Sequence, residues 1–437
     1  MSPLPPGPPE PPLIQTLRWL LRPISFLEYC RRRFGDAFSV RFLGFQTPMV
    51  MLSHPDAIRA LYSVREHGLP PGRTVALVPI VGSRSLLLLE GREHLVRRRL
   101  MLPPFHGERM RAYESIVRDA VARDVEGWPV GRPFAIHPHM QSITLDVILR
   151  AVFGVTDPAR RARLAERLGR LLASTSSVGL QFGVLLSRRL GGPDPLARLQ
   201  ALTRDIDALL AEEIAERRGD PREDILSTLV TARFEDGGDM DDGEIRDQLM
   251  TLLLAGHETT ATGLAWTFDL LLRHPRVLDR LVAEVDAGEE TYLRAVVAES
   301  LRLRPVVPLA GRRLSSKLRV NGHVLPPGTD VTPAIWLAHT RADRYPEPFA
   351  FRPERFLESA PATYAWIPFG GGVRRCLGAA FAEMEMRVAL AEILRRRAVQ
   401  PASTAAERVA RRNVTFSPSR GTRVIAAARM AARGPVA

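Results

Sequence analysis

The sequence has little cysteine, little lysine and no long apolar run. Its 437 residues include two cysteines, Cys30 and Cys376, so a disulfide framework is excluded and the cysteine content does not point to a secreted protein. Because no stretch of about 18 uncharged apolar residues occurs, no transmembrane helix is predicted. Residues 1–13 are rich in proline and lack the basic start and apolar core of a signal peptide. We therefore expect a cytoplasmic protein without a membrane anchor, beginning with a stiff, extended, proline-rich leader over residues 1–13.

Almost all of the positive charge is arginine, because Lys317 is the single lysine in a chain of formal net charge +13. A strongly basic chain invites a nucleic-acid partner. Here, however, arginines alternate with acidic residues along stretches of helical character, such as residues 159–172 and 209–220. That alternation favours solvated helix faces, with a docking surface for an acidic protein as the second interpretation. No nucleic-acid partner is expected.

Hydrophobic periodicity predicts a mainly α fold with a small β part. Residues 16–35 have helical spacing, residues 37–53 predict a hairpin of short strands, and residues 318–339 form a second β-like patch. Further helices are predicted near residues 108–127, 140–153, 158–174, 196–218, 222–233, 241–273 and 276–303. The irregular stretch 340–375 is too long for an idle connection. Without repeats or a convincing linker, one domain over residues 1–437 is the simplest organisation.

The second cysteine lies in a glycine-rich, arginine-flanked turn ahead of an apolar helix. A thiolate is a strong, soft metal ligand, and free N–H groups at a helix start stabilise a negative sulfur. Glycines such as Gly370, ahead of Cys376, permit close backbone approaches. Arg374 can offer a cation to an acidic ligand, Gly378 leaves room for a flat ligand, and Phe369 can shield the sulfur from water. The simplest alternative is a buried, inert cysteine near a helix start.

Three other groupings of polar residues accompany this turn. Glycine and a charged side chain destabilise a buried helix, yet the predicted helix 241–273 contains the run Ala255 to Thr260. Within this run, Glu258 and Thr259 could also be an ordinary polar pair whose hydrogen bonds are satisfied in the helix. Glu299 and Arg302 share one helix face, as do His94 and Arg98. An exposed salt pair and a basic surface helix are the ordinary explanations of these last two groupings.

Together, these spacings resemble the cytochrome P450 family. The turn resembles the heme-binding signature, in which the cysteine thiolate is the axial iron ligand. The run from Ala255 resembles the segment where the long helix opens over the iron to make an oxygen pocket. Glu299, Arg302 and a downstream Arg355 resemble the buried ionic cluster that holds the cysteine loop. These elements span residues 94 to about 390 in the family's order, and the whole chain resembles a soluble bacterial member.

The resemblance implies a heme b cofactor between the long helix and the helix after the cysteine, with Cys376 as the metal ligand. It implies space for O2 at Ala255, a hydrogen bond from Thr259 and a proton relay through Glu258. The implied cofactor-binding residues are His94, Arg98, Ala255, Arg312, Phe369, Gly370, Arg374, Cys376 and Gly378. Arg313 is an equal alternative to Arg312 as a partner of the heme propionates. Losing one member of the ionic cluster Glu299, Arg302 and Arg355 should cost roughly 3–5 kcal/mol.

The implied activity is that of a monooxygenase, which inserts one oxygen atom from O2 into a lipophilic small molecule such as a terpenoid, steroid or fatty acid. By family position, the substrate pocket includes two largely apolar stretches and four single residues. They are residues 74–90 and 178–186, Leu254, Val307, Leu309 and Phe416. Each could equally be ordinary core packing.

The electrons should come from another protein, because the chain has neither a nucleotide-binding fingerprint nor cysteines for an iron–sulfur cluster. We expect a ferredoxin or flavodoxin with its reductase. Such carriers are usually acidic, so arginines at 97–99 and around Cys376 could form their docking face. Two alternatives remain: a non-catalytic heme sensor and a heme-thiolate enzyme that uses peroxide. The Glu258–Thr259 pair argues against both.

Overall fold

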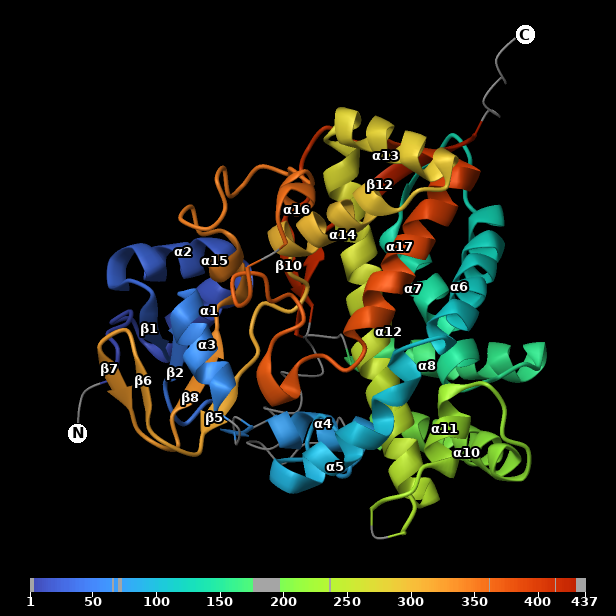
Figure 1. The fold of residues 1–437 in the computed structure, drawn as a ribbon, viewed down its shortest axis with the longest axis horizontal. Coiled ribbons are helices and arrows are strands. Elements are labelled where there is room, and N and C mark those ends of the chain that lie inside the picture. Colours follow the sequence, from blue (N-terminus) through green and yellow to red (C-terminus); the bar gives the residue numbers. More distant parts are fainter. Residues whose placement is uncertain are drawn as a thin grey trace.

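The computed structural model describes residues 4–64, 67–69, 73–175, 197–235, 237–360, 362–412 and 414–429, and helices dominate it (Figure 1). The helices are α1 (Pro12–Leu21), α2 (Pro23–Phe34), α3 (Pro55–Ser63), α4 (Arg73–Val81), α5 (Gly91–Met101), α6 (Arg109–Glu126), α7 (His137–Val147), α8 (Pro158–Thr175), α10 (Ala197–Gly219), α11 (Ile225–Thr231), α12 (Asp242–Leu272), α13 (Pro275–Ala287), α14 (Thr291–Leu303), α15 (Ile335–His339), α16 (Arg355–Glu358) and α17 (Ala379–Arg396). The mainly α fold predicted from the periodicity is confirmed.

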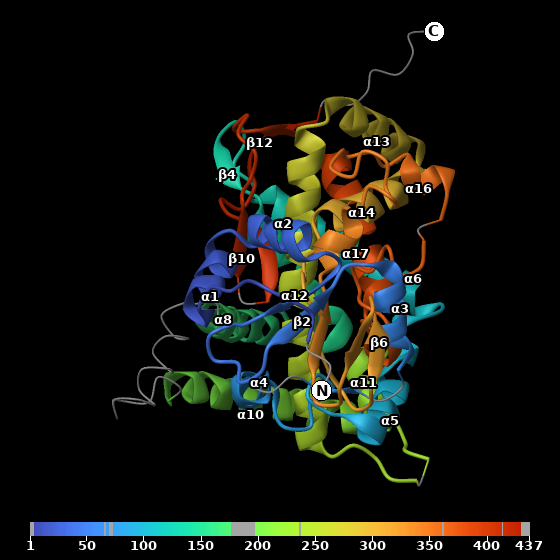
Figure 2. The same ribbon diagram turned by 90° about the vertical axis from the view of Figure 1, so that its left-hand side faces the viewer.

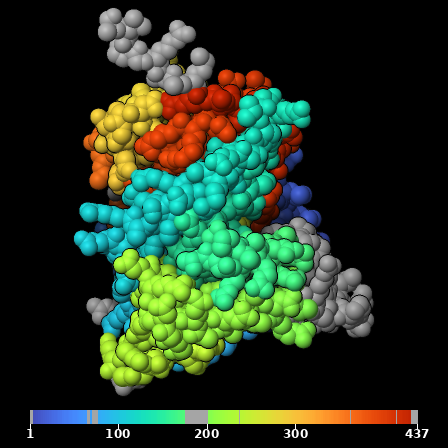
Figure 3. All heavy atoms as spheres, turned by 90° about the vertical axis from the view of Figure 1, so that its right-hand side faces the viewer, coloured from blue at the N-terminus to red at the C-terminus, as the bar shows by residue number. Residues whose placement is uncertain are grey.

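The long helix α12 crosses the molecule and organises the other helices around it (Figure 1). It begins where the Asp241 side chain accepts a hydrogen bond from the Glu244 N–H at 2.8 Å, which is an ordinary N-cap. Its 31 residues correspond to a length of about 46 Å. Helices α7, α14 and α17 contact it directly. Figure 3 shows α6 crossing one face of the molecule, where it packs on α7 and α17.

The β part is built from short strands. They are β1 (Ala37–Val40), β2 (Met49–Leu52), β3 (His67–Gly68), β4 (Pro133–Ala135), β5 (Arg312–Leu314), β6 (Leu318–Val320), β7 (His323–Leu325), β8 (Asp330–Pro333), β9 (Arg397–Pro401), β10 (Val409–Arg412), β11 (Thr415–Pro418) and β12 (Arg423–Ala428). The largest sheet has the order β1-β2-β8-β5-β3. The predicted hairpin is confirmed, with Ala37 opposite Leu52. The parallel pairing of β2 with β8 joins segments far apart in the sequence.

Three details differ from the sequence-based expectations. The predicted helix 276–303 is two helices, because Gly288 adopts a left-handed backbone (φ 75°) that ends α13. The first helical segment is likewise divided at Pro23, and α1 already begins at Pro12, inside the proline-rich leader. The described part of that leader is bonded to β1, since the Ser39 hydroxyl donates to the Pro5 carbonyl at 2.7 Å.

Among the residues that the structure describes, no helix combines the length and the hydropathy needed to cross a membrane.

Candidate active site around Cys376

The turn that carries Cys376 lies directly ahead of α17, and glycines determine its path. Gly370 and Gly372 have φ angles of 67° and 65°, a region that residues with a Cβ rarely adopt. A Cβ on Gly371 would lie 2.5 Å from the ring of Tyr62 in α3. The three glycines therefore allow the turn to lie against α3, which a chain with side chains at these positions could not do.

The pKa of the Cys376 thiol is raised overall, although two neighbouring groups favour its anion. Its backbone N–H donates to the Phe369 carbonyl at 2.9 Å, which closes the turn, and its side chain keeps access to solvent. The surrounding protein raises the pKa of the thiol, whereas the Gly378 N–H and the charge of Arg98 lower it. The helix start and the arginine thus both direct positive potential at the sulfur, as a thiolate ligand requires.

Three arginines and a histidine converge beside this turn, and we call them the cationic cluster. They are His94 and Arg98 on α5, Arg312 on β5 and Arg374 in the turn itself. Burial, together with the charges of the three arginines, lowers the pKa of His94 to about 4. Arg374 also donates to the carbonyl of Leu89, just ahead of α5. Cations gathered in this way favour an anionic group such as a carboxylate.

The structure distinguishes Arg312 from its neighbour Arg313, because successive strand residues point to opposite faces. Arg312 is buried, with its guanidinium carbon 5.8 Å from the centre of the Tyr62 ring. Arg313 instead faces Asp330 at 3.9 Å. Arg312 is therefore the member of the pair that belongs to the cationic cluster.

The middle of α12 is open between two largely buried parts of the helix. Ala255 is exposed, and Thr259 and Leu254 are half-buried. The Thr259 hydroxyl donates to the Ala255 carbonyl at 2.6 Å. A hydroxyl bonded in this way competes with the backbone N–H groups of the helix for the same carbonyl. The helix therefore presents a small residue and a hydroxyl side by side at this opening.

Glu258 is held from the side of α7. Gln141 donates to one carboxylate oxygen at 2.5 Å, Thr262 donates to the other at 3.3 Å, and His137 lies 3.6 Å away. Burial raises the pKa of Glu258, while Gln141, the charge of Arg412 and Thr262 act in the opposite direction. The net shift moves the pKa of Glu258 upward, toward neutral pH. Gln141 and His137 gave no recognisable signal in the sequence, because they lie more than a hundred residues from Glu258.

A second buried carboxyl was missed by the sequence analysis. Glu385 on α17 is 2% exposed, and burial raises its pKa to about 8 in spite of a hydrogen bond with Thr260. Its only sequence signal is a charge among the apolar residues of that helix. At neutral pH this side chain is mainly a neutral acid.

Glu299, Arg302 and Arg355 form a compact ion group that we call the balanced cluster, because each of the two guanidinium groups is paired with a carboxylate oxygen. Arg302 binds both carboxylate oxygens of Glu299 at 2.7 Å, and Arg355 binds one of them at 3.1 Å. Glu299 and Arg302 are fully buried. The backbone N–H of Arg352 donates a further hydrogen bond at 3.0 Å. The carboxylate is therefore surrounded by donors, which is the condition for burying an ion pair.

The balanced cluster is connected to the cysteine turn through His339, which the sequence analysis also missed. Arg302 donates to the His339 carbonyl at 2.8 Å and to the Pro348 carbonyl at 2.7 Å. The Nε2 atom of His339 accepts a hydrogen bond from the Ile367 N–H at 2.8 Å, just ahead of Phe369. The cluster thus fixes the irregular stretch that leads to the turn.

The predicted substrate-pocket residues have varied positions. Leu254 and Val307 are half-buried. Leu309 packs at the edge of a core cluster near the N-terminus, and the ring of Phe416 lies 5.6 Å from that of Trp19 in the same cluster. Residues 178–186 lie outside the described residues. A role of these side chains in substrate binding stays a prediction.

The arginines expected to dock a redox partner are only partly available. Arg97 pairs with the buried Glu244 at 2.9 Å, and Arg98 belongs to the cationic cluster. Arg99 is exposed but pairs with Glu235 at 3.1 Å. Arg375, next to the cysteine, is exposed. Arg375 and Arg99 are therefore the exposed members of this set, and a docking face on them stays a prediction.

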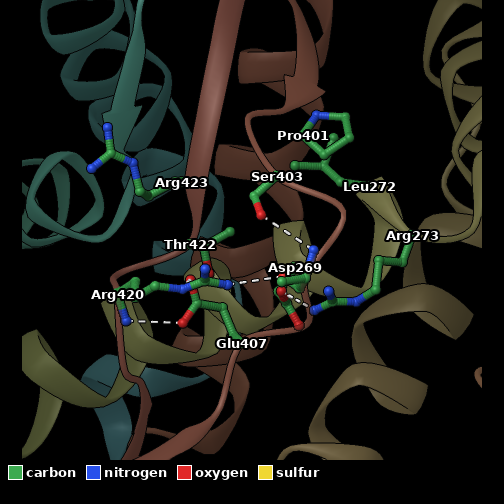
Figure 4. Close-up of a pocket in the computed structure, with 10 residues that line it drawn as sticks. Asp269, Leu272, Arg273, Pro401, Ser403, Glu407, Arg420, Thr422 and Arg423 are labelled. Carbon is green, nitrogen blue, oxygen red and sulfur yellow. Dashed lines mark hydrogen bonds and ion pairs between the residues drawn. The ribbon is translucent and has the colours of Figure 1, made fainter.

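A polar hollow lies elsewhere, at the end of α12, and Figure 4 shows its lining. Asp269 pairs with Arg273, and Glu407 lies 3.5 Å from Arg420. The hollow has a volume of about 20 Å³, which is close to the space of a single water molecule. Both of its carboxylates are already paired, so we assign it no catalytic role.

Comparison with known proteins identifies relatives of this chain. A family model described as cytochrome P450 matches residues 5–422. A Mycobacterium tuberculosis protein named "Putative cytochrome P450 135B1" is 42% identical over 435 residues, covering 96% of this chain and 91% of the relative. A second protein of that organism, "Putative cytochrome P450 138", is 38% identical over 432 residues, covering 97% of this chain and 96% of the relative.

Solved structures are similar over nearly the whole chain. Retinoic acid-bound cyanobacterial CYP120A1 has a TM-score of 0.84 at 25% identity, covering 98% of this chain and all of that one. The heme domain of cytochrome P450DA has a TM-score of 0.84 at 23% identity, covering 98% of both chains, and shows the same fold. With a fold, a family model and sequence relatives in agreement, this chain belongs to the cytochrome P450 family.

Proposed function

We propose that this chain is a heme b monooxygenase that inserts one oxygen atom from O2 into a lipophilic small molecule. The observation that carries the proposal is the convergence of the cationic cluster on the turn of Cys376 in a chain of the cytochrome P450 family. The family is one of heme-thiolate monooxygenases in general, and what we add is the assignment of the residues. We further propose one domain over residues 1–437, located in the cytoplasm.

The residues around Cys376 fit a flat group that carries an iron atom and two carboxylates. The exposed thiol provides a soft ligand, and Gly378 leaves the start of α17 open, since a Cβ there would meet only the Phe105 ring at 3.9 Å. Arg98, Arg312 and Arg374 would bind the carboxylates, with His94 beside them. When bound, heme supplies the iron at which O2 is activated.

Glu258 and Thr259 would control protons beside the opening of α12. The raised pKa of Glu258 lets this carboxyl take up a proton from water and release it again. The Thr259 hydroxyl, which now donates to Ala255, would turn toward the opening to donate there. Ala255 keeps that space free because it has no side chain beyond Cβ.

We infer a lipophilic substrate, such as a terpenoid, steroid or fatty acid, from the apolar character of Leu254, Val307 and Leu309. Apolar linings of this kind bind apolar molecules through burial of their surface. The retinoic acid bound to CYP120A1 is a lipophilic acid, which is compatible with this class. Electrons would come from a ferredoxin or flavodoxin with its reductase, docked near Arg375.

The first experiment is the carbon monoxide difference spectrum of the dithionite-reduced protein supplied with heme. A strongly red-shifted Soret band is expected from thiolate ligation. Cys376→Ala should abolish that band, whereas Cys30→Ala should keep it, because burial raises the pKa of Cys30 to about 12 and leaves it a thiol. If both variants kept the band, the assignment of Cys376 as the ligand would be disproved.

A second experiment separates the alternative activities. NADPH consumption with surrogate redox partners should depend on substrate and yield a hydroxylated product. Turnover supported by hydrogen peroxide alone would favour a peroxide-using enzyme instead. Heme binding without any product in either system would favour a sensor.

A further inference from the structure

The first helix of the chain presents its apolar face to solvent. Five exposed aliphatic side chains share that face of α1: Leu13, Ile14, Leu17, Leu20 and Leu21. The opposite face carries Gln15 and Trp19, which are buried. An amphipathic helix of a globular protein ordinarily turns its apolar stripe toward the core. The orientation of α1 is the reverse.

Specific contacts determine this orientation. The Gln15 amide donates to the carbonyls of Pro8 at 3.1 Å and Glu10 at 2.7 Å, and its oxygen accepts from the Arg41 N–H at 2.8 Å. The Trp19 ring lies 5.8 Å from that of Phe42. Turning α1 over would break these hydrogen bonds and expose an indole, so the outward apolar face is built into the fold.

The turn between β1 and β2 extends the apolar surface. Leu43 and Phe45 are 52% and 46% exposed, and the Leu43 N–H donates to the Thr16 hydroxyl of α1 at 2.7 Å. We call the α1 face, Leu43 and Phe45 the apolar patch. Figure 2 shows α1 at an edge of the molecule, beside β10. Contiguous exposed apolar surface of this kind marks an interaction site.

The charge around the apolar patch is positive. Arg22 and Arg41 are exposed at its border. Arg18 lies over the Tyr29 ring at 4.5 Å and pairs with Glu10 at 2.6 Å. An exposed apolar helix face bordered by arginine is typical of helices that lie in the interface of anionic membranes. The patch has seven side chains, well short of the ~20–30 residues that each partner supplies to a stable protein interface.

We propose that α1 and the β1–β2 turn dock this chain on the surface of an anionic phospholipid bilayer. The apolar patch enters the headgroup region, and Arg22 and Arg41 face the phosphates. The chain lies on the membrane without spanning it. This binding is independent of the proposed oxygenation, so either can fail alone. Because the centre of the Trp19 ring lies 5.6 Å from that of Phe416, docking would also bring a predicted substrate-pocket segment near the lipid.

The test is flotation of the full chain with vesicles of phosphatidylglycerol and phosphatidylcholine, compared with pure phosphatidylcholine. The wild type should bind the anionic vesicles, and Leu17→Glu with Leu21→Glu should reduce the bound fraction at least tenfold. Leu357→Glu is the matched control, because Leu357 is an exposed aliphatic residue (39%) on α16, on the other side of the molecule in Figure 2. This control should bind like the wild type.

A second pair of substitutions tests the charge. Arg22→Gln with Arg41→Gln should weaken binding to anionic vesicles and flatten its dependence on salt. Equal binding to both kinds of vesicle, or unchanged binding of the Leu17→Glu and Leu21→Glu variant, would overturn the proposal. So would a wild-type dimer in sedimentation velocity that this variant converts to monomer, because the patch would then join two copies of the chain. Leu13→Glu with Leu20→Glu repeats the test should the first variant lose its circular dichroism.

Discussion

Arginine is used in opposite ways in the balanced cluster and in the cationic cluster. In the balanced cluster, Arg302 and Arg355 surround one carboxylate, that of Glu299, and all three side chains are buried. In the cationic cluster, Arg98, Arg312 and Arg374 all lie near His94, whose pKa they help to lower. The first arrangement stabilises the folded chain. The second gathers charge of one sign around His94, and that charge would attract an anionic ligand.

The largest effect is expected from breaking the balanced cluster. Glu299→Gln leaves two buried guanidinium groups without their anion, so the free energy of unfolding should fall by roughly 3–5 kcal/mol. Urea denaturation of the variant and the wild type measures this difference.

Glu358→Gln is the matched control for that substitution. Glu358 pairs with Arg352 at 2.6 Å, but its side chain is 58% exposed. Its loss should cost no more than about 1 kcal/mol. A cost for Glu299→Gln as small as that of the control would contradict the structural role of the balanced cluster.

The cationic cluster should respond in ligand binding more than in stability. Arg312→Gln removes one charge-assisted hydrogen bond to a carboxylate, which corresponds to roughly 1.5–3 kcal/mol, or about a ten- to hundredfold weaker affinity for heme. Titration of the apoprotein with heme, followed by Soret absorbance, measures the affinity.

Arg313→Gln, one residue away on the other face of β5, should leave the affinity for heme close to that of the wild type, since Arg313 faces Asp330. Equal losses of heme affinity in Arg312→Gln and Arg313→Gln would mean that Arg312 acts only through its positive charge and not through a specific contact.

The two clusters should also differ in their response to acid. Burial lowers the pKa of His339, beside the balanced cluster, to about 3, and that of His94 to about 4. Both values lie below the ordinary value of about 6.5, so on acidification the unfolded chain takes up these protons first. The contribution of these two neutral histidines to the free energy of unfolding is fully present above about pH 6.5. It is lost as the pH falls toward 4 for His94 and toward 3 for His339.

His94→Gln should therefore flatten the acid limb of the stability curve of the apoprotein by about 1.4 kcal/mol per pH unit. With heme bound, the difference between His94→Gln and the wild type should shrink, because carboxylates near His94 would raise its pKa. Unfolding curves from pH 4 to 7, with and without heme, measure both effects. An unchanged difference on adding heme would place the carboxylates away from His94.

The smallest effect on stability is expected outside both clusters, at Thr259. Thr259→Ala removes a hydroxyl that bonds only its own helix, so the free energy of unfolding should change by less than about 1 kcal/mol. The heme-thiolate spectrum should remain, while more hydrogen peroxide is formed per NADPH consumed. Loss of the spectrum in Thr259→Ala would contradict the proposed division of roles between Thr259 and Cys376.

Several parts of the fold could be predicted because their signals are local. The alternation at residues 37–53 predicts the β1–β2 hairpin, and the periodicity of residues 241–273 matches α12 nearly to its ends. The division at Gly288 could not be predicted from the pattern, because glycine within a helical pattern is tolerated in some helices and ends others. The strands β9 to β12 were missed because they are short. β12 also pairs with β4, far away in the sequence, although β10 and β11 pair with each other as neighbours in the chain.

The sequence by itself determined the residues that can do chemistry: a cysteine among glycines, an acid and a threonine in an apolar helix, and arginines at helical spacing. Spacing carries that information because it is a property of neighbouring residues. Only the tertiary structure decided that Arg312 rather than Arg313 joins His94, that Gln141 and His137 hold Glu258, and that α1 turns its leucines outward. These outcomes depend on which distant segments become neighbours, and burial and charge act through space rather than along the chain.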